Sequence, residues 1–354
     1  MSVRLHETFS KMSGKDLLIT GGAGFLGYYL VQAPLAWNAA NPDLDPVRVT
    51  VHDNFIRGVP TWLENLDAPS LRIVKRDVLS PLPDDEPRFD WIIHAASIAS
   101  PIFYRQFPIE TMDANVDGLR LILDHMKERA DGPNPVEGFL FFSTSEIYGD
   151  PDPAFIPTSE DYRGNVSCTG PRACYDESKR YGETLCVNFA QQYGLPIGIA
   201  RPFNNYGPGL RIDDGRVLPD FARNVLNGQD IVMLSDGQAT RTFCYVADSV
   251  TGYYLILGHA SQYPGESFNI GTDLPEITMR ELADRVVVLG KELFGYEGEV
   301  VQKTSDDPEY LTDNPNRRCP IITKARTMLG YEPEVEIDDG LRRALRWYEQ
   351  QPER

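Results

Sequence analysis

A short apolar run followed at once by closely spaced glycines constrains the fold of this chain more than any other feature. Asp16-Leu-Leu-Ile-Thr20 is typical of a buried strand, and Gly21-Gly-Ala-Gly-Phe-Leu-Gly27 leads directly into an apolar helix start. Gly21, Gly24 and Gly27 permit a tight turn, close approach of a pyrophosphate to the backbone, and close helix–strand packing. The phosphates would lie on the first N–H groups of that helix. A flexible turn is the alternative, but the place between strand and helix favours a dinucleotide site.

Asp53 follows the second predicted strand, Val47–His52. A carboxylate at this point accepts both ribose hydroxyls of NAD and repels the 2′-phosphate of NADP. The spacing from the glycines exceeds the usual interval of about twenty residues, and a Pro/Asn-rich insertion at 39–46 accounts for the excess. Arg57 lies close enough to keep NADP as an alternative, but Asp53 favours NAD. A turn residue before Asn54 is a second role for Asp53, compatible with the first.

Up to about residue 200, apolar runs alternate with amphipathic segments. The predicted strands are Leu17–Thr20, Val47–His52, Leu71–Lys75, Trp91–His94, Gly138–Ser143 and Pro196–Ala200, and the predicted helices include Pro108–Glu128 and Tyr175–Gln192. Such alternation predicts an α/β fold with a doubly wound parallel Rossmann sheet that binds its ligands at the carboxyl ends of the strands.

Beyond Pro202 the chain is richer in Gly, Pro, Asn and Asp, and its elements are shorter. Strands are predicted at Ile231–Leu234 and Phe268–Ile270, and helices at Met279–Phe294 and Ile337–Gln350. We therefore expect a smaller C-terminal α/β substrate-binding lobe. The predicted division gives residues 1–205 and a return segment, 240–262, to the Rossmann domain, and 206–239 with 263–354 to the smaller lobe.

Composition limits the classes of function. The chain is 42% apolar and 24% charged, as in ordinary globular proteins, and a formal net charge of −18 argues against nucleic-acid binding. It contains no apolar run of about eighteen residues and no signal sequence, so we expect a cytoplasmic protein without a membrane partner. The five cysteines (168, 174, 186, 244 and 319) lack metal-ligand spacing and are expected to be reduced thiols. No metal site is predicted.

Tyr175 and Lys179 lie four residues apart, on one face of a predicted helix. The lysine can stabilise the phenolate, which could then take a proton from a sugar hydroxyl while a nicotinamide takes the hydride. Thr144-Ser145-Glu146 follows the strand Gly138–Ser143, so its hydroxyls and carboxylate are expected to face the same cleft. The alternatives are a solvated Tyr–Lys pair, a strand-terminating turn and a surface acid.

These motifs belong to a longer set of matching residues. They are GGAGFLG (21–27), HAASIASPIFY (94–104), STSEIYGDP (143–151), SEDYRGNV (159–166), GPRACYDESKRYGET (170–184), FNNYGP (203–208), DGRV (214–217), TRTFCYVAD (240–248) and KARTMLGYEP (324–333). In these residues the chain resembles the extended short-chain dehydrogenase/reductase family, and within it the UDP-glucuronate decarboxylases, or UDP-xylose synthases. The match covers nearly the whole chain.

The resemblance implies roles for individual residues. The implied catalytic residues are Thr144, Ser145, Glu146, Tyr175, Lys179 and Arg241, with Tyr175 as base and then acid. The implied cofactor-binding residues are Gly21, Gly24, Phe25, Leu26, Gly27, Asp53, Asn54, Asp77, Val78 and Ala95, together with Tyr175 and Lys179. The implied substrate-binding residues are Ser100, Asn204, Arg211, Arg216 and Arg241. The resemblance further implies NAD as cofactor, UDP-glucuronate as substrate, and a homodimer formed through helices 108–128 and 175–192.

The choice within the family depends on residues 145 and 146. Related 4,6-dehydratases carry Asp-Glu after the threonine, whereas here Ser145 replaces the acid that donates a proton for water loss. The 4-epimerases usually have a small hydroxyl residue in place of Glu146. Decarboxylation to UDP-xylose, or release of the 4-keto pentose, therefore fits best. An epimerase, a dehydratase and a catalytically silent dinucleotide-binding protein remain the alternatives.

Several residues leave details open. Arg241 is expected to orient the substrate carboxylate, and a structural ion pair with an acid such as Asp248 is the alternative. Ser167-Cys168-Thr169 stands where the family has Asn-Pro-Ile, and an aromatic residue expected near the uracil is replaced around Leu234. The segment 309–318 looks longer than usual and can reshape nucleotide contacts through Arg317 or Arg318. Uridine and thymidine are both left open.

Overall fold

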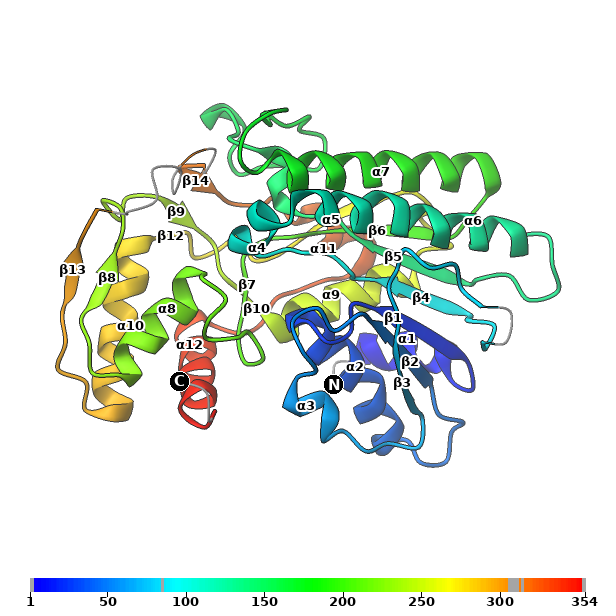
Figure 1. Cartoon of the computed structure of the whole chain (residues 1–354), viewed down its shortest axis with the longest axis horizontal. Helices are drawn as coiled ribbons and strands as arrows, with labels where there is room; N and C mark the ends of the chain where they lie inside the picture. The colour runs from blue at the N-terminus through cyan, green and yellow to red at the C-terminus, as the bar shows by residue number, and fades with distance from the viewer. Residues whose placement is uncertain (1–2, 84–85, 305–311, 313–314, 352–354) are drawn as a thin grey trace.

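Seven parallel strands form the central sheet, in the order β11-β6-β5-β4-β1-β2-β3 (Figure 1). The computed structural model describes residues 3–83, 86–304, 312 and 315–351. The strands are β1 (Asp16–Thr20), β2 (Arg48–Asp53), β3 (Leu71–Lys75), β4 (Trp91–His94), β5 (Gly138–Phe142), β6 (Ile197–Pro202) and β11 (Ser267–Ile270). The order reverses between β1 and β4, and this reversal creates the crevice in which doubly wound sheets bind ligands. The predicted fold class is confirmed.

Helices cover both faces of this sheet (Figure 1). One face carries α1 (Val3–Met12), α2 (Phe25–Ala40), α9 (Val246–Gly258) and α11 (Thr323–Leu329), and the other carries α5 (Pro108–Asp113), α6 (Leu119–Arg129) and α7 (Ala173–Tyr193). The short helices α3 (Thr61–Glu64) and α4 (Pro101–Gln106) follow β2 and β4. Because both faces are covered, the inner strands are buried, as all four residues of Trp91–His94 illustrate, whereas the edge strand β3 is largely exposed.

The predicted helix 108–128 is interrupted. Between α5 and α6 the backbone forms a π-helical segment, Ala114–Gly118, in which Asn115 is fully buried. The Asn115 side chain donates to Ser178 Oγ at 2.9 Å, and that hydroxyl donates to the Tyr175 carbonyl at 3.0 Å. The π-turn therefore lies where this helix passes the start of α7. Turns of this kind are often found at functional sites.

A second core lies in the C-terminal half of the chain, between α8 (Val217–Leu226), α10 (Met279–Phe294) and α12 (Ile337–Glu349), at the left of Figure 1. A parallel pair, β8 (Ile231–Met233) with β13 (Val300–Gln302), flanks these helices. Further short strands are β7 (Asn205–Tyr206), β9 (Thr240–Arg241), β10 (Cys244–Tyr245), β12 (Ile277–Thr278) and β14 (Arg317–Arg318). Two 3₁₀ helices, Ser145–Tyr148 and Pro153–Phe155, follow β5.

The chain passes between these two parts more than once. After α8 and β8, the helix α9 packs against β5 and β6, and β11 then adds the outermost strand of the large sheet beside β6. The helix α11 packs against β11 and α9. Consequently residues 267–270 and 323–329 lie with the Rossmann sheet, within the range expected for the smaller lobe. No helix among the described residues is both long and apolar enough to span a bilayer.

Candidate active site

The glycine loop joins β1 to α2 in the geometry that a pyrophosphate requires. A Cβ on Gly21 would lie 2.5 Å from the backbone of Ala96, and one on Gly27 would lie 2.2 Å from the Gly22 carbonyl oxygen. A Cβ on Gly24 would meet only the Gly21 oxygen, at 3.5 Å, so the space before the helix is open. Gly24 is the N-cap of α2, whose first N–H groups have no partner within the helix. The loop therefore fits the phosphates of a dinucleotide.

Asp53 lies at the carboxyl end of β2, beside this loop. Its two carboxylate oxygens accept hydrogen bonds from the backbone N–H groups of Ala23, at 3.0 Å, and Phe55, at 2.8 Å. Burial raises the pKa of Asp53, and these two hydrogen bonds lower it. The carboxylate is thus fixed between the glycine loop and the turn after β2, where a ribose bound to the loop would meet it.

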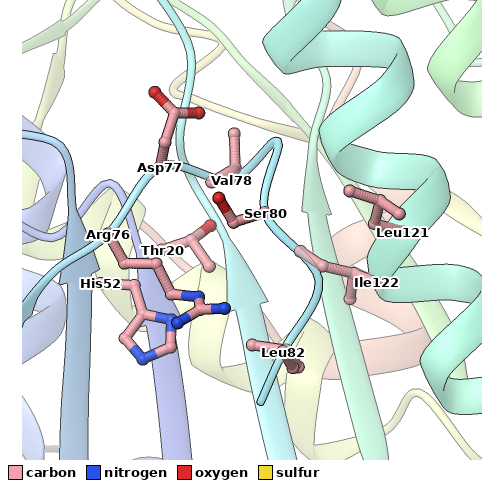
Figure 2. Close-up of a pocket in the computed structure, with 9 residues that line it drawn as sticks. All are labelled: Thr20, His52, Arg76, Asp77, Val78, Ser80, Leu82, Leu121 and Ile122. Atoms are coloured by element: carbon pink, nitrogen blue, oxygen red, sulfur yellow. The ribbon is translucent and has the colours of Figure 1, made fainter.

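The remaining predicted cofactor residues lie on the loops after β3 and β4. Asn54 Nδ2 donates to Asp77 Oδ2 at 3.0 Å, and the Leu79 N–H donates to Asp77 Oδ1 at 3.0 Å. Ala95 directly precedes Ala96, against which Gly21 packs. Asp77 and Val78 also line a small cavity, shown in Figure 2, together with Thr20, His52, Arg76, Ser80, Leu82, Leu121 and Ile122. The structure therefore brings the predicted cofactor residues to one edge of the sheet.

Thr144, Tyr175 and Lys179 meet at the carboxyl end of β5. All three are at least nine-tenths buried. The Lys179 ammonium donates to the Phe142 carbonyl at 2.8 Å and lies 5.9 Å from the centre of the Tyr175 ring. Tyr104 stacks on Tyr175, with ring centroids 5.1 Å apart. The predicted oxidoreduction group is thus assembled on α7 and the loop that begins the 3₁₀ helix.

Burial dominates the titration of this group. It raises the pKa of Tyr175 to about 12, although a hydrogen bond with Thr144 and the charge of Arg216 lower it. Burial also lowers the pKa of Lys179 to about 7. The sequence led us to expect that Lys179 governs the tyrosine pKa, whereas here desolvation is the largest effect on both groups.

Glu146 is the centre of a cluster of guanidinium groups. Arg318 donates to both of its oxygens, at 2.5 Å to Oε1 and 2.6 Å to Oε2, and Arg172 donates to Oε2. Burial alone would raise the pKa of Glu146, but the charges of Arg318 and Arg172 outweigh it and hold the pKa at about 2. The carboxylate is therefore ionised at neutral pH. The Asp176 carboxylate also lies 3.8 Å from Arg172, so the charges of Arg318 and Arg172 are balanced by those of Glu146 and Asp176.

Arg241 lies on β9, next to Arg318 on β14, its register partner. Its guanidinium donates to the carbonyl groups of Thr240, at 2.7 Å, and Pro315. Burial lowers the pKa of Arg241 to about 9; Arg318 and Arg172 contribute to the decrease, and Glu146 opposes it. The predicted alternative partner, Asp248, accepts the Val335 N–H at 2.9 Å. Arg241 thus adds a third guanidinium to the surroundings of Glu146.

Of the predicted substrate residues, Ser100 and Arg216 share contacts with Asp214. The Ser100 hydroxyl donates to the Asp214 carbonyl at 3.0 Å, and Arg216 Nε lies 3.1 Å from Asp214 Oδ1. Arg216 also lies close enough to Tyr175 to lower its pKa. Arg57, which kept NADP open as an alternative, pairs with Asp214 Oδ2 at 3.2 Å. Its charge is therefore directed to a carboxylate of the protein.

The other two predicted substrate residues lie further along this region. Asn204 adopts φ 40° and donates to the Thr242 carbonyl at 2.9 Å. Arg211 is exposed and donates to both oxygens of Asp213, at 2.8 Å each. Ser167, Cys168 and Thr169 are all exposed.

Sequence reasoning did not assign Arg172 a role and gave Arg318 only a possible nucleotide contact. Arg172 lies three residues before Tyr175, a spacing that places both at the start of one helix. The position of Arg318 depends on the small sheet β12-β9-β14, which no local pattern predicts. Within the segment 309–318, residues 309–311, 313 and 314 lie outside the described part of the chain.

The glycine loop, Asp53 and the Thr144–Tyr175–Lys179 group define a dinucleotide-dependent enzyme of the short-chain dehydrogenase/reductase type. The chain belongs to the NAD dependent epimerase/dehydratase family, whose model matches residues 17–271, and its cofactor is NAD. NAD supplies this family with a reversible hydride acceptor.

Two relatives and one solved structure show which members of the family this chain is similar to. The chain is 40% identical, over 93% of its length, to UDP-glucuronic acid decarboxylase 5 of Arabidopsis thaliana, of which it covers 88%. It is 35% identical, over 97% of its length, to UDP-glucuronic acid decarboxylase 1 of Xenopus tropicalis, of which it covers 74%. Among solved structures, dTDP-glucose 4,6-dehydratase from Streptomyces venezuelae, determined with NAD and TYD bound, matches with a TM-score of 0.78 and 28% identity. That match covers 94% of this chain and 96% of the dehydratase.

Proposed function

We propose that this protein is a UDP-glucuronate decarboxylase, which oxidises C4 of the sugar, releases C6 as CO₂ and re-reduces C4 to give UDP-xylose. The observation that carries the proposal is the net positive cluster of Arg318, Arg172 and Arg241 around ionised Glu146, close to Tyr175. Such a cluster suits a sugar that carries a carboxylate. The two decarboxylases described above support the same reaction and substrate.

Tyr175 and Thr144 perform the acid–base work at C4. Tyr175, as phenolate, takes the C4 hydroxyl proton while the C4 hydride would pass to bound NAD⁺, and the resulting ketone makes the C6 carboxylate a β-keto acid. In the protein alone the pKa of Tyr175 is about 12, so the phenolate requires the positive charge that NAD⁺ would bring beside it. When the C5–C6 bond breaks, its electron pair moves into an enolate whose oxygen is at C4. The hydroxyl of Thr144 and the now protonated Tyr175 can each donate a hydrogen bond to that oxygen, which stabilises the charge as it develops.

The arginines orient the substrate carboxylate without holding it too strongly. Glu146 takes both carboxylate-binding N–H groups of Arg318 and one from Arg172. This competition weakens the grip on the substrate, which matters because tight binding of the ground-state carboxylate would oppose the departure of neutral CO₂. Glu146 thus sets the balance of charge around the leaving group.

The proton that C5 needs after CO₂ release comes from a group other than Glu146. Since its pKa is about 2, Glu146 carries no proton at neutral pH. Ser145 is buried directly beside it and offers a hydroxyl, alone or through water. A serine at this position also disfavours elimination of water, for which a dehydratase uses a carboxylic acid.

The test is incubation of the purified protein with UDP-glucuronate and NAD⁺, followed by mass spectrometry of the nucleotide sugars. A product lighter by CO₂, without net NADH, supports decarboxylation to UDP-xylose or an isomer. A product lighter by CO₂ and two hydrogens, with matching NADH, supports release of the 4-keto pentose. An unchanged mass with inversion at C4 by NMR would make the protein an epimerase and refute the proposal.

We further propose the division into two lobes given above, with the residues of β11 and α11 assigned to the Rossmann lobe.

We also propose a homodimer that forms through the outer faces of α5 and α7. Ile109 and Met112 on α5 are 63% and 42% exposed, and Tyr181 on α7 is 51% exposed. The two helices pack side by side, so these apolar groups can form one surface. Multi-angle light scattering tests the dimer, and Ile109→Glu should yield monomers.

The five free cysteines support a cytoplasmic location.

A further inference from the structure

Arg57 reaches across the nucleotide-binding edge of the sheet. It lies on the loop after β2, four residues beyond Asp53. Its guanidinium stacks on the ring of Phe103 in α4, 4.3 Å from the ring centre, and pairs with Asp214 at 3.2 Å and Asp213 at 3.9 Å. One side chain from the β2 side thus contacts the helix that follows β4 and the loop 211–216 together.

Asp214 is held from two sides. Its carboxylate faces Arg57, from the loop after β2, and its carbonyl oxygen accepts the hydroxyl hydrogen of Ser100, from the loop after β4. In the sheet, β1 lies between β2 and β4. Asp214 therefore joins the loops that follow the two neighbours of β1, the strand that carries the glycine loop.

The neighbouring residues follow the same path. A Cβ on Gly209 would lie 3.1 Å from Cγ of Tyr28, in the first turn of α2, and one on Gly215 would lie 2.3 Å from Cδ1 of Ile102, in α4. The segment 209–215 thus packs against α2 at one end and α4 at the other. Asp214 itself is 4% exposed, so its carboxylate depends on Arg57 and Arg216 for compensation.

We propose that Arg57 is a positioning residue: through Asp214 it holds the segment 209–216 closed over the bound dinucleotide and keeps Arg216 directed towards Tyr175. Asp214 links the two arginines, because its carboxylate lies 3.2 Å from Arg57 and 3.1 Å from Arg216. Loss of Arg57 leaves Asp214 with one partner and frees the segment on the β2 side. The dinucleotide then escapes faster, and Arg216 loses its fixed orientation.

The proposal rests on NAD as the cofactor and not on decarboxylation, so it is tested without a sugar nucleotide. Bound, fluorescent NADH is displaced by excess NAD⁺ in a stopped-flow instrument, and the dissociation rate is compared between variants. Arg57→Gln should release NADH about tenfold faster, which corresponds to the loss of one partly buried ion pair. Arg57→Lys should restore part of the retention, since the ammonium can still pair with Asp214. Asp214→Asn should resemble Arg57→Gln, and the double variant should release NADH no faster than either single variant.

Arg48→Gln is the matched control. It removes another Arg–Asp pair, with Asp16 at 2.6 Å, from the opposite end of the same strand. It should leave the dissociation rate within about twofold of the parent. The proposal is overturned if the Arg57→Gln variant has the same melting temperature as the parent and also releases NADH at the parent rate. It is equally overturned if the two single effects add in the double variant, because Arg57 and Asp214 would then act independently.

Discussion

Arg318 binds both carboxylate oxygens of Glu146, at 2.5 and 2.6 Å, although 172 positions separate the two residues in the sequence. A bidentate pair fixes the plane of the carboxylate as well as its distance. Glu146 is thereby held at the carboxyl end of β5 by a side chain from the small sheet β12-β9-β14. The geometry of the proposed decarboxylation site depends on the docking of that sheet.

Arg318→Lys should lower kcat for CO₂ release about a hundredfold and change NADH affinity less than threefold. A lysine keeps the charge but cannot bind both oxygens of Glu146. The measurement is CO₂ release in a single turnover, with NADH titration by fluorescence. Arg317→Lys is the control, because Arg317 makes its bidentate pair with Glu276 instead and should change kcat only about threefold or less. Equal losses in both variants would count against a special role for Arg318.

Glu146 should make the stability of the protein depend on pH in the acid range. Its pKa is lowered from 4.5 to about 2, so its charge stabilises the folded state above the unfolded pKa, and this contribution is lost as the pH falls from about 4.5 towards 2. Glu146→Gln cannot titrate. The difference in unfolding free energy between parent and variant should therefore shrink by about 3 kcal/mol across that window, at 1.36 kcal/mol per pKa unit.

Urea unfolding at several pH values measures this difference, since all other carboxylates are common to both proteins. A difference that stays constant between about pH 6 and pH 3 would mean that Glu146 is not held ionised by its arginines. The same variant should lose CO₂ release while it retains NADH binding.

Tyr175→Phe should reduce turnover at least about a thousandfold, because the ring remains and only the proton-transferring hydroxyl is lost. The Tyr104 ring stacks on the Tyr175 ring, 5.1 Å between centroids, and phenylalanine keeps that ring, so the melting temperature should change little. The readouts are CO₂ release, NADH affinity and thermal unfolding. Turnover near the parent rate would remove Tyr175 from the role of base.

Gly24→Ala and Gly27→Ala should separate cofactor binding from folding. A Cβ on Gly24 makes one ordinary contact, at 3.5 Å, so the variant should fold but bind NADH at least about tenfold more weakly, because the methyl group occupies the phosphate side of the loop. A Cβ on Gly27 would lie 2.2 Å from a backbone oxygen, so that variant should lose several degrees of melting temperature. Thermal unfolding and NADH titration of both variants check the distinction. Weak binding with normal stability in Gly27→Ala would contradict it.

Local patterns predicted the strands of the sheet well. The strands 71–75 and 91–94 were predicted to the residue. The structure adds a contact that was not predicted, in which the N–H group of Ala23 in the glycine loop donates to Asp53. The π-turn at 114–118 was not foreseen. The π-turn accompanies a tertiary contact, the buried hydrogen bond from Asn115 to Ser178 on α7. The spacing of apolar residues in 108–128 does not predict such a contact.

The candidate site was less accessible to sequence reasoning. The Tyr175–Lys179 spacing is local and visible, whereas the partners of Glu146 come from residues 172 and 318. The resemblance pointed to Arg241, whereas in the structure Arg318 binds the carboxylate of Glu146 and Arg241 donates to the carbonyl groups of Thr240 and Pro315. The lowered pKa of Lys179 depends on complete burial, which no pair of residues in a motif can predict.

The arginine cluster around Glu146 is a local group of positive charges in a molecule with a formal net charge of −18. The net charge therefore repels an anionic nucleotide sugar at long range, whereas the cluster attracts it at short range, within about 8 Å at physiological ionic strength. Moderate salt shields the long-range repulsion before it weakens the buried arginines, so it should speed the encounter with substrate. Most charged clefts that steer a ligand from afar behave in the opposite way. This protein recognises its anion on contact.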